Sequence, residues 1–113
     1  MLKHQIPLYK FWYMLSWDQR RMESMFERDP NNKPFIGRTY YDGNKGWVGI
    51  CLNPNGIHDF PEMAAVLTHE LSHVVAYVMG HCGWFPQDPD DMEPWCYLQE
   101  HLMTVSLKYM GYR

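Results

Sequence analysis

Two histidines one helical turn apart, with a glutamate between them, are the residues of this chain best suited to chemistry. They lie in the stretch His69-Glu70-Leu71-Ser72-His73, an HExxH pattern. On a helix, positions i and i+4 lie one above the other, so both imidazoles reach a single metal ion, and zinc commonly takes imidazole nitrogens. Glu70 is rotated by about 100° from His69, which suits a base beside the ion better than a ligand. The pattern predicts a zinc site with His69 and His73 as metal ligands and Glu70 as the general base.

A catalytic zinc site takes three protein ligands and leaves one position for water, so a third ligand has to come from elsewhere in the chain. Glu93 lies twenty residues after His73, in the first turn of the next helix that we expect. A helix that returns along the motif helix would bring this carboxylate over the histidine pair. Glu100 and His101 share the face of Glu93 at i+7 and i+8 and remain alternatives. We predict Glu93 as the third ligand.

The motif helix and the segment after it together resemble a known family. HELSH followed by Glu93-Pro94-Trp95-Cys96-Tyr97-Leu98 is similar to the gluzincin zinc metallopeptidases, and in particular to small zincin-like proteins of phages and prophages. The resemblance covers residues 46–101. It implies a minimal zincin-like domain that binds Zn²⁺ through the two motif histidines and a Glu of the following helix. It also implies a substrate-binding edge strand before the motif helix, for which residues 47–52 are the candidate.

Peptide hydrolysis also needs a donor that stabilises the oxyanion of the transition state. The candidates in this chain are Tyr97, His58, His81 and His101. We predict Tyr97 as a catalytic residue in addition to Glu70. Where the gluzincins related to thermolysin have an Asp four residues after the Glu ligand, this chain has Tyr97.

The expected function is therefore that of a zinc metallopeptidase, a hydrolase that acts on a protein or peptide substrate. A chain of 113 residues has no second domain to form the far wall of a cleft, so we expect a narrow target. The alternative is a non-catalytic, zinc-stabilised protein-binding module, such as a phage accessory or structural protein. The intact Glu70 favours chemistry, because a structural zinc site has no use for it.

The N-terminal part of the chain has apolar side chains at helical spacing. This pattern predicts a helix over residues 8–28, and residues 29–32 (DPNN) are expected to end it. Aromatic side chains lie on more than one side of this helix, which indicates either packing on both faces or a surface for a partner or a homo-oligomer. They are Tyr9, Phe11, Trp12, Tyr13 and Trp17.

The remaining elements are a hairpin and two helices. Residues 35–41 and 47–52 are rich in strand-forming residues and flank the turn-forming segment DGNKG, and alternation in 47–52 predicts one buried face. Asp59 and Glu62 indicate the start of the motif helix, which we expect to run to Met79 and to end at Gly80. A second capping pattern, DDME at residues 90–93, opens a last helix to about Tyr109. The order of helix, hairpin, helix and helix predicts a single α+β domain over residues 1–113.

Composition excludes several other classes of protein. Apolar residues make up 46% of the chain and aromatic residues 16%, which excludes global disorder. The formal net charge is −3 and the basic residues are scattered, so we expect no nucleic-acid partner. The longest apolar run, residues 74–79, is too short to span a membrane. Three cysteines without a CxxC spacing indicate reduced thiols and a cytoplasmic protein, located in the host cytoplasm if a phage encodes it.

Overall fold

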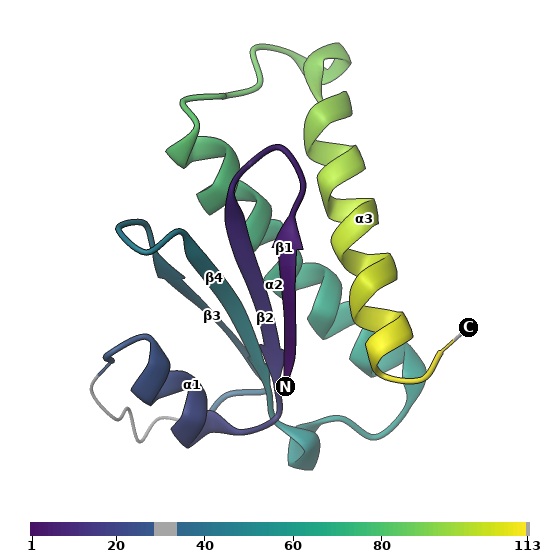
Figure 1. The fold of residues 1–113 in the computed structure, drawn as a ribbon. Coiled ribbons are helices and arrows are strands. Elements are labelled where there is room, and N and C mark those ends of the chain that lie inside the picture. Colours follow the sequence, from purple (N-terminus) through teal and green to yellow (C-terminus); the bar gives the residue numbers. More distant parts are fainter. Residues whose placement is uncertain (29–33, 113) are drawn as a thin grey trace.

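A four-stranded sheet forms the centre of the protein, in a computed structural model that describes residues 1–28 and 34–112 (Figure 1). The strands follow the spatial order β1-β2-β4-β3 and span Leu2–Ile6 (β1), Phe11–Ser16 (β2), Gly37–Asp42 (β3) and Trp47–Leu52 (β4). β1 pairs with β2 and β3 pairs with β4 in antiparallel fashion, whereas β2 and β4 are parallel. With three α-helices packed on this sheet, the predicted α+β class is confirmed.

The predicted helix over residues 8–28 is wrong. Its first part forms β2, which pairs with β1 in a hairpin, and only α1 (Gln19–Met25) is helical. Leu8 and Lys10 take positive φ angles of 72° and 57° in the turn between the two strands, a conformation that non-glycine residues seldom adopt and that no glycine in this turn signals. The expected terminating segment, residues 29–32, lies outside the described residues. The fold therefore begins with two strands that the apolar spacing did not indicate.

The aromatic residues assigned to that helix lie instead in and around a strand that is covered on both faces. Phe11 and Tyr13 are buried on one face of β2, while Trp12 and Trp17 remain 41% and 38% exposed. A strand with covers on both sides loses the apolar–polar alternation that would have identified it. The same holds for β4, whose expected single buried face is corrected to two, because Val48, Ile50 and also Cys51 are buried.

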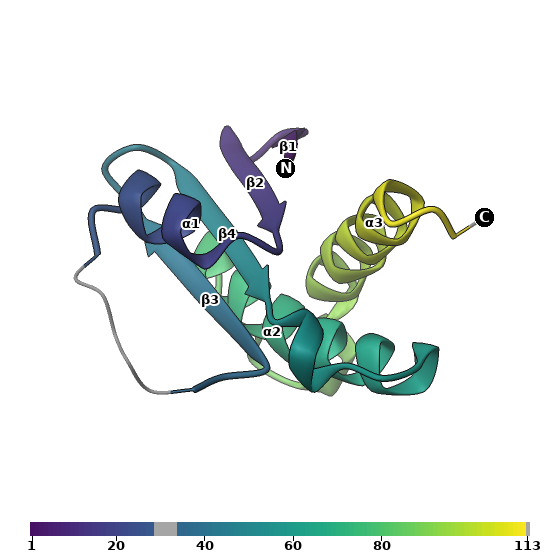
Figure 2. The ribbon, with the colours of Figure 1, turned by 90° about the horizontal axis from the view of Figure 1, so that it is seen from below.

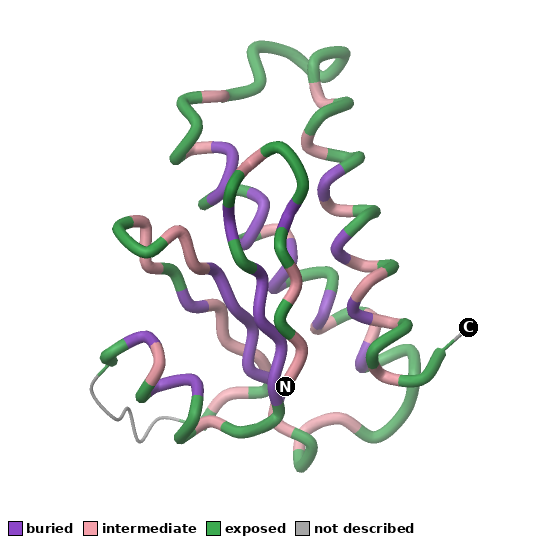
Figure 3. Tube along the Cα trace, viewed as in Figure 1, coloured by how far each residue is buried: buried purple, intermediate pink, exposed green. Residues whose placement is uncertain are grey.

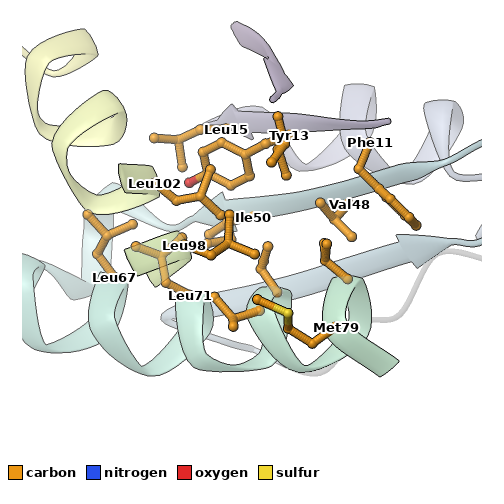
Figure 4. Close-up of a cluster of buried hydrophobic side chains, with 14 of the residues drawn as sticks. Phe11, Tyr13, Leu15, Val48, Ile50, Leu67, Leu71, Met79, Leu98 and Leu102 are labelled. Carbon is orange, nitrogen blue, oxygen red and sulfur yellow. The ribbon is translucent and has the colours of Figure 1, made fainter. Parts of the chain in front are cut away.

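Helices cover the two faces of the sheet unequally (Figure 2). α2 (Phe60–His81) and α3 (Glu93–Tyr109) pack on one face, and α1 lies on the other. In the burial-coloured trace the central strands are buried along most of their length (Figure 3). The larger core lies under α2 and α3 and includes the residues labelled in Figure 4, namely Phe11, Tyr13, Leu15, Val48, Ile50, Leu67, Leu71, Met79, Leu98 and Leu102. The smaller core, under α1, contains Met14, Met22, Phe26, Tyr40 and Cys51.

The ends of the two long helices agree only in part with the prediction. Asp59 caps α2 as expected, by accepting a hydrogen bond of 2.9 Å from the backbone N–H of Glu62. α2 then continues past Gly80 to His81, and it is Gly83, with a φ of 76°, that takes the left-handed conformation after the helix. α3 spans the predicted residues but begins without a side-chain cap. The expected capping residue, Asp90, lies within a short 3₁₀ turn (Pro89–Asp91), and Asp88 caps that turn.

Candidate functional site

The motif helix α2 separates an apolar face from a face that carries the histidine pair. Its buried residues include Leu67, Leu71 and Val74, whereas His69 and His73 are exposed to solvent. The two imidazole rings have their centroids 5.0 Å apart and are inclined at 74°. Two imidazoles one turn apart on an open helix face fit two nitrogen positions of a zinc ion.

The Glu70 side chain lies against the edge strand β3. Glu70 is 7% exposed, the Thr39 hydroxyl donates a hydrogen bond to Glu70 Oε2 at 2.7 Å, and the same Oγ1 lies 3.2 Å from the backbone oxygen of Glu70. Gly37 opens the space for this packing, because a Cβ at that position would lie 3.0 Å from Glu70 Cγ. The carboxylate is therefore fixed where the motif helix meets the strand edge.

A glutamine, and not an acid, joins α3 to the polar side of the motif helix. Gln99 Nε2 donates to Ser72 Oγ at 3.0 Å and lies 3.5 Å from the backbone oxygen of Thr68. Sequence reasoning missed both Gln99 and Thr39. The only signal for Gln99 was a polar residue beside the core position Leu98, and Thr39 had no signal, because its role depends on strand pairing.

The three candidates for the third ligand lie elsewhere on α3. Two of these candidates, Glu93 and His101, line a groove of about 450 Å³ against the β1–β2 turn, residues 6–9, and Tyr97 lines the same groove. Glu100 lies in a shallow hollow that Tyr97 and His101 also border. Within residues 1–28 and 34–112, no three His, Cys, Asp or Glu side chains are gathered in a group that could hold a metal ion. The structure thus brings the rings of His69 and His73 together and holds the Glu70 carboxylate against β3, and the ligand role of Glu93 stays a prediction.

The predicted oxyanion donor Tyr97 and its alternatives His81 and His58 all lie at least eight residues from the histidine pair along the chain. Tyr97 is 66% exposed on the groove just described. His81 lies at the far end of α2, about 12 Å beyond His73 at 1.5 Å per residue, where its Nδ1 is 3.0 Å from the hydroxyl of Tyr41. His58 precedes the helix, and its backbone N–H donates to the Glu62 carboxylate.

A further phenol near the motif belongs to α2 itself. Tyr77 is one turn beyond His73 on the same helix and is 43% exposed. Its ring stacks on Tyr41 of β3, with centroids 4.5 Å apart and an angle of 8° between the planes. The i, i+4 spacing of His73 and Tyr77 was the signal in the sequence that could have found it.

Comparison with known protein families, with curated proteins and with solved structures finds no match to this chain. None of the helices in the described part of the chain has the length and apolar character needed to cross a membrane.

Proposed function

We propose that this protein is a zinc-dependent peptide hydrolase whose site lies between the motif helix α2 and the edge strand β3. One observation carries the proposal: the helix directs His69 and His73 to solvent and, from the residue between them in the motif, directs a buried carboxylate to the strand edge. A helix that needed only polar surface at these positions would have no reason to bury Glu70.

Each of the three motif residues then has a separate task. His69 and His73 would hold the metal through ring nitrogens. Zinc bound there supplies Lewis acidity and lowers the pKa of water toward neutrality. Glu70 Oε2 already accepts from Thr39, and a carboxylate has further acceptor positions with which to take a proton from water and pass it to the leaving amine.

The substrate strand has to be β3 and not the predicted residues 47–52. β4 is hydrogen-bonded to β2 on one side and to β3 on the other, so it has no edge to offer. β3 ends the sheet and contacts α2 through Gly37 and Thr39. An extended peptide that adds to β3 would pass beside Glu70. Because both histidines are on an open face, we propose a narrow target recognised by its backbone and by a few side chains.

Metal analysis of variants, followed by a peptidase assay, tests this function. His69→Gln/His73→Gln should lose one equivalent of zinc per chain relative to the native protein, and Glu93→Ala should weaken or lose the same equivalent if Glu93 is the third ligand. Glu70→Gln should keep the zinc and the fold but lose hydrolysis. Unchanged zinc in the double histidine variant, or retained hydrolysis in Glu70→Gln, would refute the proposal.

A second candidate follows from the separation of Glu93 from the histidine pair. Without a third ligand in place, zinc on α2 would stabilise a protein-binding module without supporting chemistry. The groove between the β1–β2 turn and α3, where Leu8 is 96% exposed, would then be the contact surface. Under this function zinc raises the thermal midpoint and Glu70→Gln changes no activity. In either case the free thiols fit the proposed cytoplasmic location.

A further inference from the structure

Two histidines outside the motif meet across the gap between β1 and α3. His4 is on β1 and His101 on α3, and their Nε2 atoms are 2.9 Å apart. The ring centroids are 5.0 Å apart, and the planes are tilted by 46°. β1 is the strand that runs beside α3 (Figure 1). The two residues are 97 positions apart in the chain, so the fold alone brings them together.

The separation of the two nitrogens is close to what a shared metal ion requires. Two nitrogen ligands at 2.0–2.1 Å from a tetrahedral ion lie about 3.3 Å from each other, so the rings need to open by only about 0.4 Å. In the metal-free pair, one ring donates its Nε2 proton to the other. When that proton moves to Nδ1 of the same ring through solvent, both Nε2 lone pairs are available.

We propose that His4 and His101 form a second metal site, a two-histidine clip for a divalent transition-metal ion such as Zn²⁺ or Ni²⁺ that ties β1 to α3. The site is independent of His69 and His73. Imidazole suits both metals, and water completes the coordination. His101 also borders a shallow hollow with Glu100 and Thr104, so this part of α3 is open to solvent.

The backbone on both sides of the clip is held by neighbouring contacts. Ile6, on the same face of β1 as His4, is buried in the main core, and so is Leu102, next to His101. One turn further along α3, the buried hydroxyls of Ser106 and Tyr13 are 2.8 Å apart, and Tyr13 is the cross-strand partner of His4. The two imidazoles are thus largely preorganised, which lowers the entropy lost when the metal binds.

The 113-residue chain with His69→Gln/His73→Gln isolates this site from the motif. Thermal unfolding is followed with Ni²⁺ or Zn²⁺ added and with EDTA. At a metal concentration about ten times the dissociation constant, linkage raises the thermal midpoint by about 5 °C. Addition of His101→Gln to the same background should abolish that shift, and so should His4→Gln, whereas His58→Gln, which removes an exposed histidine before α2, should leave it intact.

A spectroscopic measurement identifies the place of binding. Paramagnetic Ni²⁺ should broaden the NMR signals of β1 and of the middle of α3 in the same background and leave those of α1 sharp. A shift in midpoint that persists without His101, or the absence of any shift in its presence, would overturn the clip. Loss of zinc from the motif site does not affect this experiment, so the two proposals fail separately.

Discussion

Thr39 and Glu70 join the edge strand to the motif helix: the Thr39 hydroxyl donates a 2.7 Å hydrogen bond to a carboxylate that lies thirty-one residues further along the chain. The same hydroxyl is 3.2 Å from the backbone oxygen of Glu70. Because Glu70 is only 7% exposed, water replaces this contact only in part. The position of the predicted base therefore depends on one side chain of β3.

Removal of this hydroxyl should destabilise the protein. Thr39→Val keeps the shape of the side chain and leaves the Glu70 carboxylate without its short hydrogen bond, at a cost of about 2 kcal/mol in the free energy of unfolding. Thr39→Ser keeps the donor and should cost well under half as much. Urea unfolding of the two variants measures the difference, and equal midpoints would show that the bond contributes nothing.

Gly37 should not tolerate a methyl group. A Cβ at this position would lie 2.7 Å from Val66 Cγ1 and 3.0 Å from Glu70 Cγ, so Gly37→Ala should cost about 1–3 kcal/mol and displace the carboxylate. Gly80 is the matched control, because a Cβ there meets only Phe85, at 3.8 Å. Gly80→Ala in helix α2 should raise the free energy of unfolding by up to about 1 kcal/mol. Thermal unfolding that ranks the two variants in the opposite order would contradict this account of Gly37.

The buried contact between Tyr13 and Ser106 should show unequal losses when each partner is removed. Ser106 Oγ donates to the backbone oxygen of Leu102 at 2.7 Å, so the Tyr13 hydroxyl is the donor in the 2.8 Å contact between the two side chains. Tyr13→Phe should cost about 1 kcal/mol, whereas Ser106→Ala strands a buried phenol and should cost about 2 kcal/mol.

A double-mutant cycle checks the coupling between these two residues. Once Tyr13→Phe has removed the phenol, Ser106→Ala should cost less than it does alone. Costs that simply add would mean that the two hydroxyls do not interact.

Cysteine reactivity should divide the three thiols into two classes. Cys51 is 1% exposed, and burial, with smaller contributions from Asp18 and Glu23, raises the pKa of its thiol to about 11. At pH 8 in the native protein, a thiol reagent should modify Cys82 and Cys96 quickly, because both are exposed. Cys51 should react only after unfolding.

A change of pH should not remove this protection. At pH 9 only about one Cys51 thiol in a hundred is ionised if its pKa is about 11, so its modification stays slow. Mass spectrometry of the labelled peptides distinguishes the sites. Rapid native labelling of Cys51 would contradict the packing of α1 over the sheet.

The motif helix could be predicted because its signals are local. Asp59 and Glu62 define its start, and the stripe that contains Leu67, Leu71 and Val74 defines its buried face. The hairpin of β3 and β4 was predicted for the same reason, since its strands are joined by a short turn-forming segment. In each of these elements the interacting residues are close in sequence, and their pattern is visible without knowledge of the fold.

The N-terminal hairpin could not be predicted in this way. Leu8, Phe11 and Leu15 fit a helical period, while Phe11, Tyr13 and Leu15 fit a strand, and the sequence alone favours neither. The strand conformation is selected by the parallel pairing of β2 with β4 and by the packing of α1 on the second face of β2. That selection depends on tertiary structure, which also explains why the predicted substrate strand moved from β4 to β3.

The candidate site was predicted in the same uneven manner. That His69 and His73 lie on one face of the helix follows from helix geometry alone, and in the structure their rings are adjacent and exposed. The position of Glu93 depends on the rotation of α3 about its own axis, and that rotation is set by the burial of Leu98 and Leu102 in the core. A sequence interval of twenty residues carries no information about that angle.

The parallel pairing of β2 with β4 has a consequence for biosynthesis. Tyr13 lies opposite Val48, thirty-five residues later, so β2 leaves the ribosome well before the strand that it needs. Until then β1 is the only strand with which it can pair, and a lone hairpin is marginal in water. The nascent chain thus exposes the apolar, aggregation-prone strand β2 before its partner β4 is synthesised. The exposed residues Lys3 and Lys10 place positive charge beside β2 during this period, which opposes aggregation.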